Sequence, residues 1–314
     1  MLALTPPADA PNDATVWIDV VSPTEAERAQ VEAFVGCTLP TLDDLSEIER
    51  SSQLVAEPGR VRVACPAVAN ADTDHPSLSH IGMILTPQRL ITVRFANLRG
   101  FRMAAEQTHA AERASGIEIF TVLLEAFVDR HADLLERARQ QLDDVSRAVF
   151  RATPNERKTV ARSNEQLRVM LRRQGDIGER LSLIRDSMLG VGRIAAFAPE
   201  AGKDWVEPAY ASRLKAVGMD VDSLNQFDEH LSGKVQFLLD AIVGFIGIEQ
   251  NDIFKVLTVF SIVGIFPTLV AGWYGMNFHN MPEYGWAYGY QWGITVIVLS
   301  TVLPLIWFKW RGWW

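Results

Sequence analysis

Two uncharged stretches near the C-terminal end decide the fold: VLTVFSIVGIFPTLVAGWY at residues 256–274 and GYQWGITVIVLSTVLPLIWF at residues 289–308. Each is close to the roughly 20 apolar residues that an α-helix needs to cross the hydrocarbon core of a bilayer. A buried core helix is the alternative, but two such segments in succession, bordered by Trp and Tyr, are rare in soluble proteins. The sequence therefore predicts an integral membrane protein with two C-terminal transmembrane helices.

The distribution of basic residues orients these spans. The connecting residues 275–288 contain no Lys or Arg, whereas Lys255 precedes the first span and Lys309 and Arg311 follow the second. Cytoplasmic flanks carry the excess of basic residues in membrane proteins. We therefore expect a multi-pass protein of an inner or plasma membrane, with both termini in the cytoplasm. The N-terminal residues show no basic region followed by an apolar core, which agrees with this orientation.

The overall composition limits the kinds of partner. The chain has 30 Lys and Arg against 38 Asp and Glu, a formal net charge of −8. A nucleic-acid surface needs a basic patch that neutralises phosphates, so no nucleic-acid partner is expected. The six His residues form no HExxH or Cys/His cluster, and no nucleophile motif precedes a helix, so we expect neither an enzyme nor a resident cofactor. Cys37 and Cys65 lack metal-ligand spacing, which predicts reduced thiols.

The part before the spans is expected to form an α+β cytoplasmic domain followed by helices. Strand signals lie at 16–21, 60–65, 80–85 and 90–95, with a helix over 25–35 and a polar loop over 67–79. Apolar residues at helical spacing then predict helices over 98–115, 117–152 and 154–189, followed by a break over 190–202.

The expected organisation has six parts: an α/β domain at 1–97, a helical part at 98–204, a stalk helix at 205–255, a first transmembrane helix at 256–277, an outer loop at 278–288, and a second transmembrane helix with a basic, aromatic tail at 289–314.

One long helix is expected to enter the membrane, because no stop signal lies between Pro208 and Pro267. About 60 residues would make a rod of roughly 90 Å. Steps of three and four residues along it select mostly small or polar side chains: Asp240, Gly244, Gly247, Asn251, Phe254, Thr258, Ser261, Ile265 and Thr268. A polar stripe at the spacing of supercoiled helices predicts a water-accessible centre. Tight helix packing through small residues is the alternative.

A pore on this stripe requires a symmetric ring of subunits, because two spans cannot enclose a channel. Asp240 would then form a ring of carboxylates at the cytoplasmic mouth, where it would attract divalent cations; a solvated surface aspartate is the alternative. Pro267 frees a backbone carbonyl inside the first span, which a neighbour or a water-filled cavity must satisfy. Gly272 and Gly275 allow the chain to turn beyond the span.

The segment YGMNFHNMPE at residues 274–283 gives the most specific signal. A Pro-containing helix precedes it, and a further span and the sequence KWRGW at 309–313 follow it. This combination closely resembles the CorA family of magnesium transporters, most strongly over 235–314. The resemblance implies a funnel-shaped homopentamer. Each subunit would have an α/β cytoplasmic domain, a long stalk helix that becomes the pore-lining first span, and a peripheral second span in the lipid.

The resemblance also implies a selectivity filter formed by Gly275, Met276 and Asn277. Amide oxygens of an Asn277 ring, with the Gly275 carbonyl, would hold the water shell of a hydrated ion. Mg²⁺ gives up its waters reluctantly, so neutral amides that bind those waters can select it without trapping it. Asn277, Gly275 and Asp240 are thus the expected metal contacts.

Further inside, the family pattern implies four more roles. Thr268 matches a polar pore position, Asn251 and Leu257 fall at the narrow inner pore and hydrophobic gate, and Asp240 matches a cytoplasmic pore aspartate. Leu257 lies one residue off the stepped stripe, so its orientation rests on the resemblance. Phe254 stands where an aliphatic gate residue is expected.

Two residues of the outer segment bear on the ion. Glu283 resembles an acidic loop residue that raises the local cation concentration, with a solvated carboxylate as the alternative. His279 stands where an acidic residue is common in the family, and it would weaken cation attraction or favour softer metals, with a plain surface residue as the alternative. Zinc-transporting relatives usually carry a different middle residue in the Gly-x-Asn triplet, so Met276 favours Mg²⁺. Transport of Zn²⁺, Co²⁺ or Ni²⁺ is one alternative, and a membrane-tethered cytoplasmic sensor without transport is another.

Mg²⁺ is also expected as a regulatory ligand, because in the family intracellular Mg²⁺ bound between cytoplasmic domains holds the pore closed. The candidate ligands are acidic residues of the stalk and of the α/β domain: Asp220, Asp222, Asp228, Glu229, Asp43, Asp44 and Glu47. Solvated helix faces are the alternative for all of them.

Overall fold

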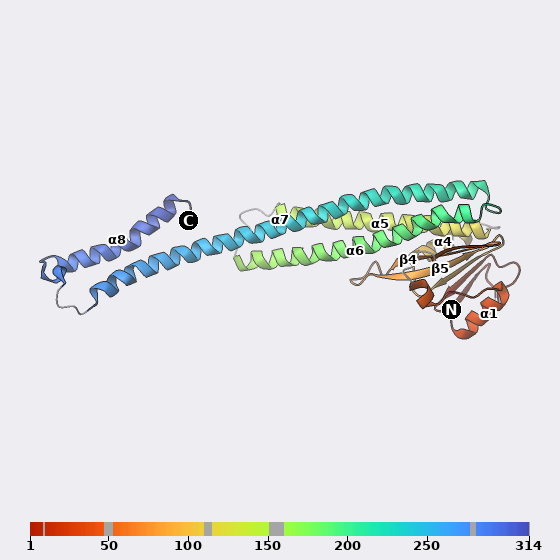
Figure 1. The fold of residues 1–314 in the computed structure, drawn as a ribbon, viewed down its shortest axis with the longest axis horizontal. Helices are drawn as coiled ribbons and strands as arrows, with labels where there is room; N and C mark the ends of the chain where they lie inside the picture. Colours follow the sequence, from red (N-terminus) through yellow and green to blue (C-terminus); the bar gives the residue numbers. More distant parts are fainter. Residues whose placement is uncertain (9, 47–52, 110–114, 151–159, 277–280, 314) are drawn as a thin grey trace. The chain divides into compact units, whose positions relative to one another are not determined.

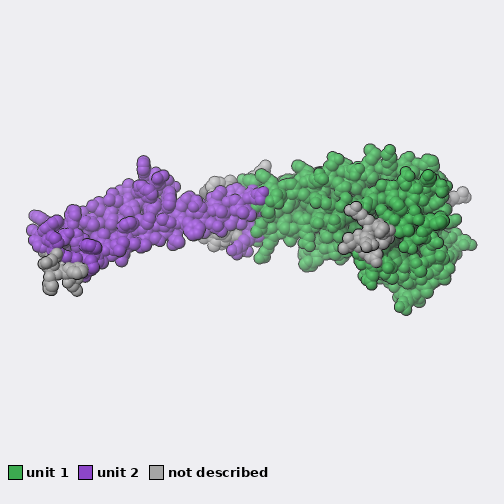
Figure 2. Space-filling model, in the orientation of Figure 1, with its two compact units in different colours: residues 1–152, 169–239 green, residues 153–168, 240–314 purple. Residues whose placement is uncertain are grey.

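The computed structural model describes residues 1–8, 10–46, 53–109, 115–150, 160–276 and 281–313. Contacts divide the chain into two units, residues 1–152 with 169–239, and residues 153–168 with 240–314 (Figure 2). The division reflects contacts within one chain and does not test the expected domain boundaries, which stay a prediction.

Unit 1 contains a six-stranded sheet, which confirms the α+β expectation (Figure 1). Its strands are β1 (Leu2–Thr5), β2 (Trp17–Val21), β3 (Leu54–Glu57), β4 (Arg60–Ala69), β5 (Ser77–Leu85) and β6 (Leu90–Arg94). The strand order is β1-β2-β6-β5-β4-β3. Among the described strands, the β2 and β6 pair alone is parallel, and the other four pairs are antiparallel.

The helix α1 (Glu25–Val35) has the predicted bounds. Thr24 caps its first turn: the Thr24 hydroxyl accepts from the Glu27 N–H at 3.3 Å, and the Glu27 carboxylate accepts from the Thr24 N–H at 2.9 Å. This reciprocal capping box satisfies two backbone donors that the helix leaves unpaired. Gly36 then ends the helix in the left-handed region at φ 71°.

The predicted loop over 67–79 is wrong at both ends, because 67–69 complete β4 and 77–79 begin β5. Ala67 and Ala69 are buried under the helices. Their small side chains give little strand signal in the sequence, since propensity for strands reflects packing on a half-buried surface. The loop itself is confined to residues 70–76.

Helices cover both faces of the sheet. On one face, α1 and α2 (Leu42–Ser46) cover a core that includes Ile18, Val20 and Val31. On the other face lie α4 (Arg99–His109), α5 (Gly116–Phe150), α6 (Val160–Ala201) and the first part of α7 (Pro208–Tyr274) (Figure 1). The ring centroids of Trp17 in β2 and Phe101 in α4 lie 6.2 Å apart in this second core.

A polar network is buried where the parallel strands meet the helices. The Arg94 guanidinium binds both oxygens of Asp19, with its Nη2 2.9 Å from Oδ2. The Thr92 hydroxyl donates to Asp19 at 2.8 Å and accepts from the Trp17 indole at 3.0 Å. Each buried polar group is therefore paired, which avoids the cost of an isolated buried charge.

The predicted break over 190–202 is wrong, since α6 continues to Ala201. Its glycines serve close packing. A Cβ at Gly190 would lie 2.7 Å from Cys65 Cβ in β4, and one at Gly192 would lie 3.0 Å from Val221 in α7. Pro199 stands in the last turn, where few further hydrogen bonds remain to be lost. The helix start predicted at Pro154 lies outside the described residues.

The continuous helix from Pro208 is confirmed: α7 has 67 residues and passes through Pro267, with a length of roughly 100 Å. It begins at Pro208 rather than near Trp205, because the N–H groups of Trp205 and Val206 bind the Gly202 carbonyl in a turn. A short turn of 3₁₀ helix, η2 (Pro282–Gly285), precedes α8 (Gly289–Trp310). By length and composition, α7 and α8 are long and apolar enough to cross a bilayer.

Substitutions of two glycines in α6 are expected to have opposite effects. Gly190→Ala should lower the thermal unfolding midpoint, since the new methyl group would overlap Cys65, whereas Gly175→Ala should raise it, since its Cβ would meet nothing within 4 Å. Removing a helix glycine without a clash gains about 0.5–1 kcal/mol. Unfolding of both variants can be followed by circular dichroism of the full chain in detergent. Equal shifts of the same sign would contradict the packing role of Gly190.

Candidate functional site

The residues expected to line a pore lie on the exposed surface of α7 within one chain. All nine are exposed: Asp240, Gly244, Gly247, Asn251, Phe254, Leu257, Thr258, Ser261 and Thr268. Two of the nine are large apolar side chains, with Phe254 64% and Leu257 58% exposed. An apolar helix with this much uncovered surface needs lipid or other protein chains around it.

The second span covers a different face of α7. Half-buried residues recur on α7 at Val259, Ile262, Val263, Pro267 and Val270, at the spacing of one helix face. Ile262 shares an apolar groove with residues of α8 that include Leu303, Pro304 and Phe308. The stripe therefore does not pack on α8. If tight helix packing explains its small residues, the partner must come from another chain.

The stripe glycines support this point. A Cβ added at Gly244 or Gly247 would meet nothing within 4 Å. Packing within the chain therefore gives no reason for a glycine at these positions. A glycine at these positions would instead allow close approach to another subunit or expose backbone carbonyls.

Two hydroxyl groups on the stripe donate to the backbone of their own helix. Thr258 Oγ1 donates to the Phe254 carbonyl at 2.7 Å, and Thr268 Oγ1 donates to the Gly264 carbonyl at 2.7 Å. These bonds satisfy the hydroxyl protons inside an apolar segment. The hydroxyl oxygens retain lone pairs that can accept hydrogen bonds from the water shell of an ion.

The C-terminal end of α7 leads into the residues predicted to form the filter. Gly275 continues the last turn by donating its N–H to the Ala271 carbonyl at 2.9 Å, and both Gly275 and Met276 are exposed. Asn277, the residue with the central predicted role, lies outside the described residues, as does His279. Glu283 is half-buried in η2, and its carbonyl accepts from the Trp286 N–H at 3.2 Å.

Among the candidate regulatory residues, Asp228 is not solvated. Its side chain is fully buried, and Arg185 of α6 binds it with Nε 2.6 Å from Oδ2. Burial raises the pKa of Asp228 above its ordinary value, against the opposing effect of Arg185. This ion pair fastens α7 to α6, and a carboxylate so engaged is a poor ligand for a regulatory ion.

Two candidates in the α/β domain have mainly local roles. The Thr41 N–H donates to Asp44 at 2.8 Å, and hydrogen bonds from Thr41 lower the pKa of Asp44. Asp43 is exposed in α2, and its carbonyl accepts a hydrogen bond from Ser46. Glu47 lies outside the described residues.

A group of acidic residues that sequence reasoning missed lies next to Asp220. Partial burial raises the pKa of Asp129 in α5, and the negative charges of Asp133, Glu125 and Asp220 add to this effect. The spacing of 125, 129 and 133 on one face of a helix was a usable signal. Among the described residues, no three or more His, Cys, Asp or Glu side chains of one chain are arranged to hold a metal ion. A regulatory ion here would need ligands from a second subunit.

Comparisons with known proteins bear on the whole chain. The family model described as "CorA-like Mg2+ transporter protein" matches residues 12–310. The magnesium transport protein CorA of Yersinia pseudotuberculosis is 30% identical over 302 residues, which cover 96% of this chain and 92% of that protein. The CorA protein of Escherichia coli K12 is 30% identical over 301 residues, with coverage of 95% and 92%.

Solved structures show the same fold. The complete CorA magnesium transporter of Methanocaldococcus jannaschii superposes with a TM-score of 0.76 at 14% identity, covering 95% of this chain and 91% of that one. The full-length CmaX protein gives a TM-score of 0.65 at 17% identity, with coverage of 95% and 88%. The family model matches nearly the whole chain, and the two CorA proteins are 30% identical to it over more than 90% of their lengths. The chain therefore belongs to the CorA family of Mg²⁺ transporters.

Proposed function

We propose that this chain is one subunit of a homopentameric channel that imports Mg²⁺ down its electrochemical gradient. The observation that carries the proposal is the exposed stripe of α7, where small and polar residues such as Gly244, Gly247 and Thr268 face away from the rest of the chain. Five copies around one axis would bring the stripes together around water. The relatives, named as magnesium transport proteins, support the choice of ion.

In this proposal the ion is selected at the outer end of the first transmembrane helix. A ring of Asn277 side chains and Gly275 carbonyls would hold the water shell of a hydrated ion, so the ion would enter without being stripped. A ring of neutral oxygens binds Mg²⁺ weakly enough to release it inward. Glu283 would raise the cation concentration beside this ring. Asp240 would form a second ring, made of carboxylates, toward the cytoplasm.

The driving force needs no nucleotide hydrolysis. Two charges that cross a membrane potential of about 100 mV gain roughly 4.6 kcal/mol. This gain requires a cytoplasmic unit 1, and the basic residues Lys255, Lys309 and Arg311 at the inner ends of the spans favour that orientation. The exposed Trp286, Tyr288 and Trp310 are suited to the two membrane interfaces.

Asn277→Ala is expected to reduce Mg²⁺ uptake while the protein still folds. Uptake into proteoliposomes should fall by at least tenfold (about 1.4 kcal/mol), roughly the worth of the hydrogen bonds that each ring position makes to the water shell. Asn280→Ala, the same substitution three residues later, is the matched control and should retain uptake.

The same assay separates the alternatives. Uptake of Zn²⁺ without Mg²⁺ uptake would place the chain among zinc transporters, and Co²⁺ and Ni²⁺ are tested alongside. No flux of any ion through folded, correctly oriented protein would leave a membrane-tethered cytoplasmic sensor as the function to pursue.

Asp240→Asn is expected to reduce Mg²⁺ flux several-fold at low ionic strength and less at high salt, because a ring of charges concentrates cations through a screened field. Asp252→Asn is the control, since Asp252 lies on the same helix and forms an ion pair with Lys255 at 2.8 Å. Initial rates at two salt concentrations measure the difference. Equal losses in the two variants would count against a pore-facing Asp240.

Mg²⁺ as a regulatory ligand is the second part of the proposal. The negative charges of Asp133, Glu125 and Asp220 that act on Asp129 support it, because like charges brought together favour a cation, and Glu125 already binds one in the Arg213 guanidinium, with Nη2 2.6 Å from Oε2. A second subunit would supply the missing ligands.

Asp220→Asn should therefore weaken the inhibition of flux by millimolar Mg²⁺ on the side of unit 1. Asp176→Asn, at an exposed acidic residue of α6 that is not among the candidate ligands, should keep it. Flux measured against internal Mg²⁺ concentration gives the inhibition constant for each variant. An unchanged constant in the Asp220 variant would remove this residue from the regulatory site.

A further inference from the structure

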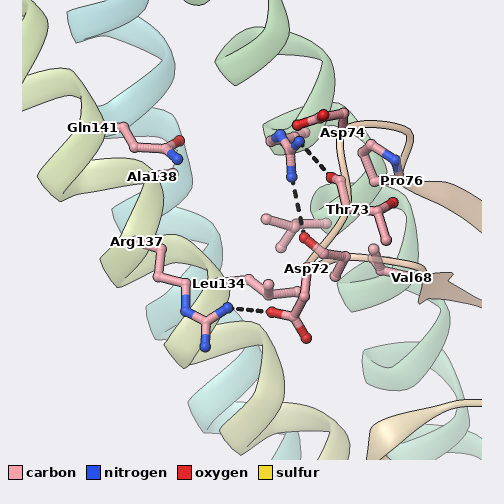
Figure 3. A pocket seen from close by; sticks show the side chains of 12 residues that line it. Val68, Asp72, Thr73, Asp74, Pro76, Leu134, Arg137, Ala138 and Gln141 are labelled. Atoms are coloured by element: carbon pink, nitrogen blue, oxygen red, sulfur yellow. Dashed lines mark hydrogen bonds and ion pairs between the residues drawn. The ribbon is translucent and has the colours of Figure 1, made fainter.

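Arginine side chains from two helices hold the loop between β4 and β5. Arg130 of α5 donates from Nη2 to Asp72 Oδ2 at 2.9 Å, and Arg137 of the same helix binds Asp72 Oδ1. Arg180 of α6 donates to the carbonyls of Ala71 at 3.1 Å and Thr73 at 2.8 Å. Figure 3 shows Arg137 directed at Asp72 across the cavity on one side of this loop.

A second cavity lies on the other side of Asp72, with a volume of about 230 Å³. A single water needs about 10–15 Å³ of such volume, so this space can hold a polyatomic ligand. We call it the arginine cavity, and its polar lining consists mainly of Asn70, Asp72, Arg99, Arg130, His131 and Ser187.

The lining contains a buried cation with unused donors. The Arg130 side chain is 9% exposed, and its Nη1 is buried without any acceptor, although Nη2 binds Asp72. A buried donor left unpaired costs about 1–3 kcal/mol, and more when it is charged. An acceptor within hydrogen-bond distance of Nη1 would remove this cost.

His131 adds polarity to the cavity but no charge. Its Nε2 lies 2.8 Å from Ser187 Oγ, while its buried Nδ1 has no partner. Burial, assisted by the charge of Arg130, lowers the pKa of His131 to about 4, so the ring is neutral near pH 7.

The start of α4 supplies further donors. Asn97, Leu98, Arg99 and Gly100 line the cavity, and the first N–H groups of a helix have no acceptors within it and attract anions. Gly100 lets the start of α4 pack closely against α5, because a Cβ there would lie 2.8 Å from the Phe127 ring.

The charge balance of the cavity is positive. Arg99 and Arg130 line it against one acid, Asp72, which is already matched by both Arg130 and Arg137. Arg99 Nη1 lies 3.9 Å from Asp72, and the Arg99 side chain is half exposed, so it can turn toward a ligand.

We propose that the arginine cavity binds a phosphate oxyanion, either free inorganic phosphate or the phosphate group of a nucleotide, between Arg99, Arg130 and the start of α4. Tetrahedral oxyanions accept several hydrogen bonds at once, which suits guanidinium groups combined with helix N–H groups. The bound anion would link α4, α5 and the β4–β5 loop and so stabilise unit 1. This site is independent of the proposed ion path.

The test is calorimetric titration of the full chain in detergent, in phosphate-free buffer with a chelator of divalent cations. Inorganic phosphate and adenosine diphosphate are the two probes. Arg99→Gln should weaken binding of the preferred probe by about tenfold, as expected for loss of a charge-assisted hydrogen bond. Arg102→Gln is the matched control, since Arg102 is exposed on the same helix and is not among the lining residues, and it should change binding less than about twofold.

Saturable phosphate binding that depends on Arg99 supports a free-anion site, and binding of the nucleotide alone with the same dependence supports the phosphate of a larger ligand. Absence of saturable binding of either probe to folded protein overturns the proposal, as do equal losses in the two variants. Hydrogen exchange of the unmutated protein gives a readout that needs no variant. Added phosphate should protect residues 70–76 and 97–101, and protection confined to other segments would also overturn the proposal.

Discussion

The structure depends on one constraint: α7 must remain a single hydrogen-bonded helix from Pro208 in unit 1 to Tyr274 at the end of its apolar segment. Inside hydrocarbon no water can satisfy backbone groups, so an interrupted segment would expose them at a cost of several kcal/mol each. The helix therefore continues through Pro267 and through several glycines. Thr258 and Thr268 direct their hydroxyl protons inward to the same backbone, so the stripe presents oxygen lone pairs and small surfaces instead of donors.

Unit 1 holds the first part of this helix by polar contacts as well as by packing. Arg185 binds the buried Asp228, and the Gln174 amide of α6 donates to the Val235 carbonyl at 2.8 Å. Lys234 binds Asp143 of α5, and Gly192 allows α6 to approach Val221. A change in the packing of α5 and α6 would therefore be transmitted to α7. Both the acidic group around Asp129 and the arginine cavity involve α5, which makes this helix the element through which ligands would act.

The two sites differ in how they manage charge. Around Asp129, acidic side chains outnumber the one cation, Arg213, that pairs with Glu125, whereas the arginine cavity has more positive than negative charge and an unpaired guanidinium nitrogen. A third arrangement occurs in the buried polar network of Trp17, Asp19, Thr92 and Arg94. There the Asp19 carboxylate is paired with the Arg94 guanidinium, and the network stabilises the fold.

The sequence by itself determined the features that rest on local chemistry. The two spans follow from uncharged runs, α1 from its capping residues, and α7 from the absence of a stop signal, while the Gly-Met-Asn motif identified the family. Tertiary structure alone decided the order of the strands, the continuation of α6 through Gly190, and the burial of Asp228. It also brought Asp72, Arg99 and Arg130 together around one cavity. Such features depend on contacts between residues far apart in the chain, and neither periodicity nor propensity encodes them, because a glycine or an acid reads the same in sequence whether it packs, pairs or faces water.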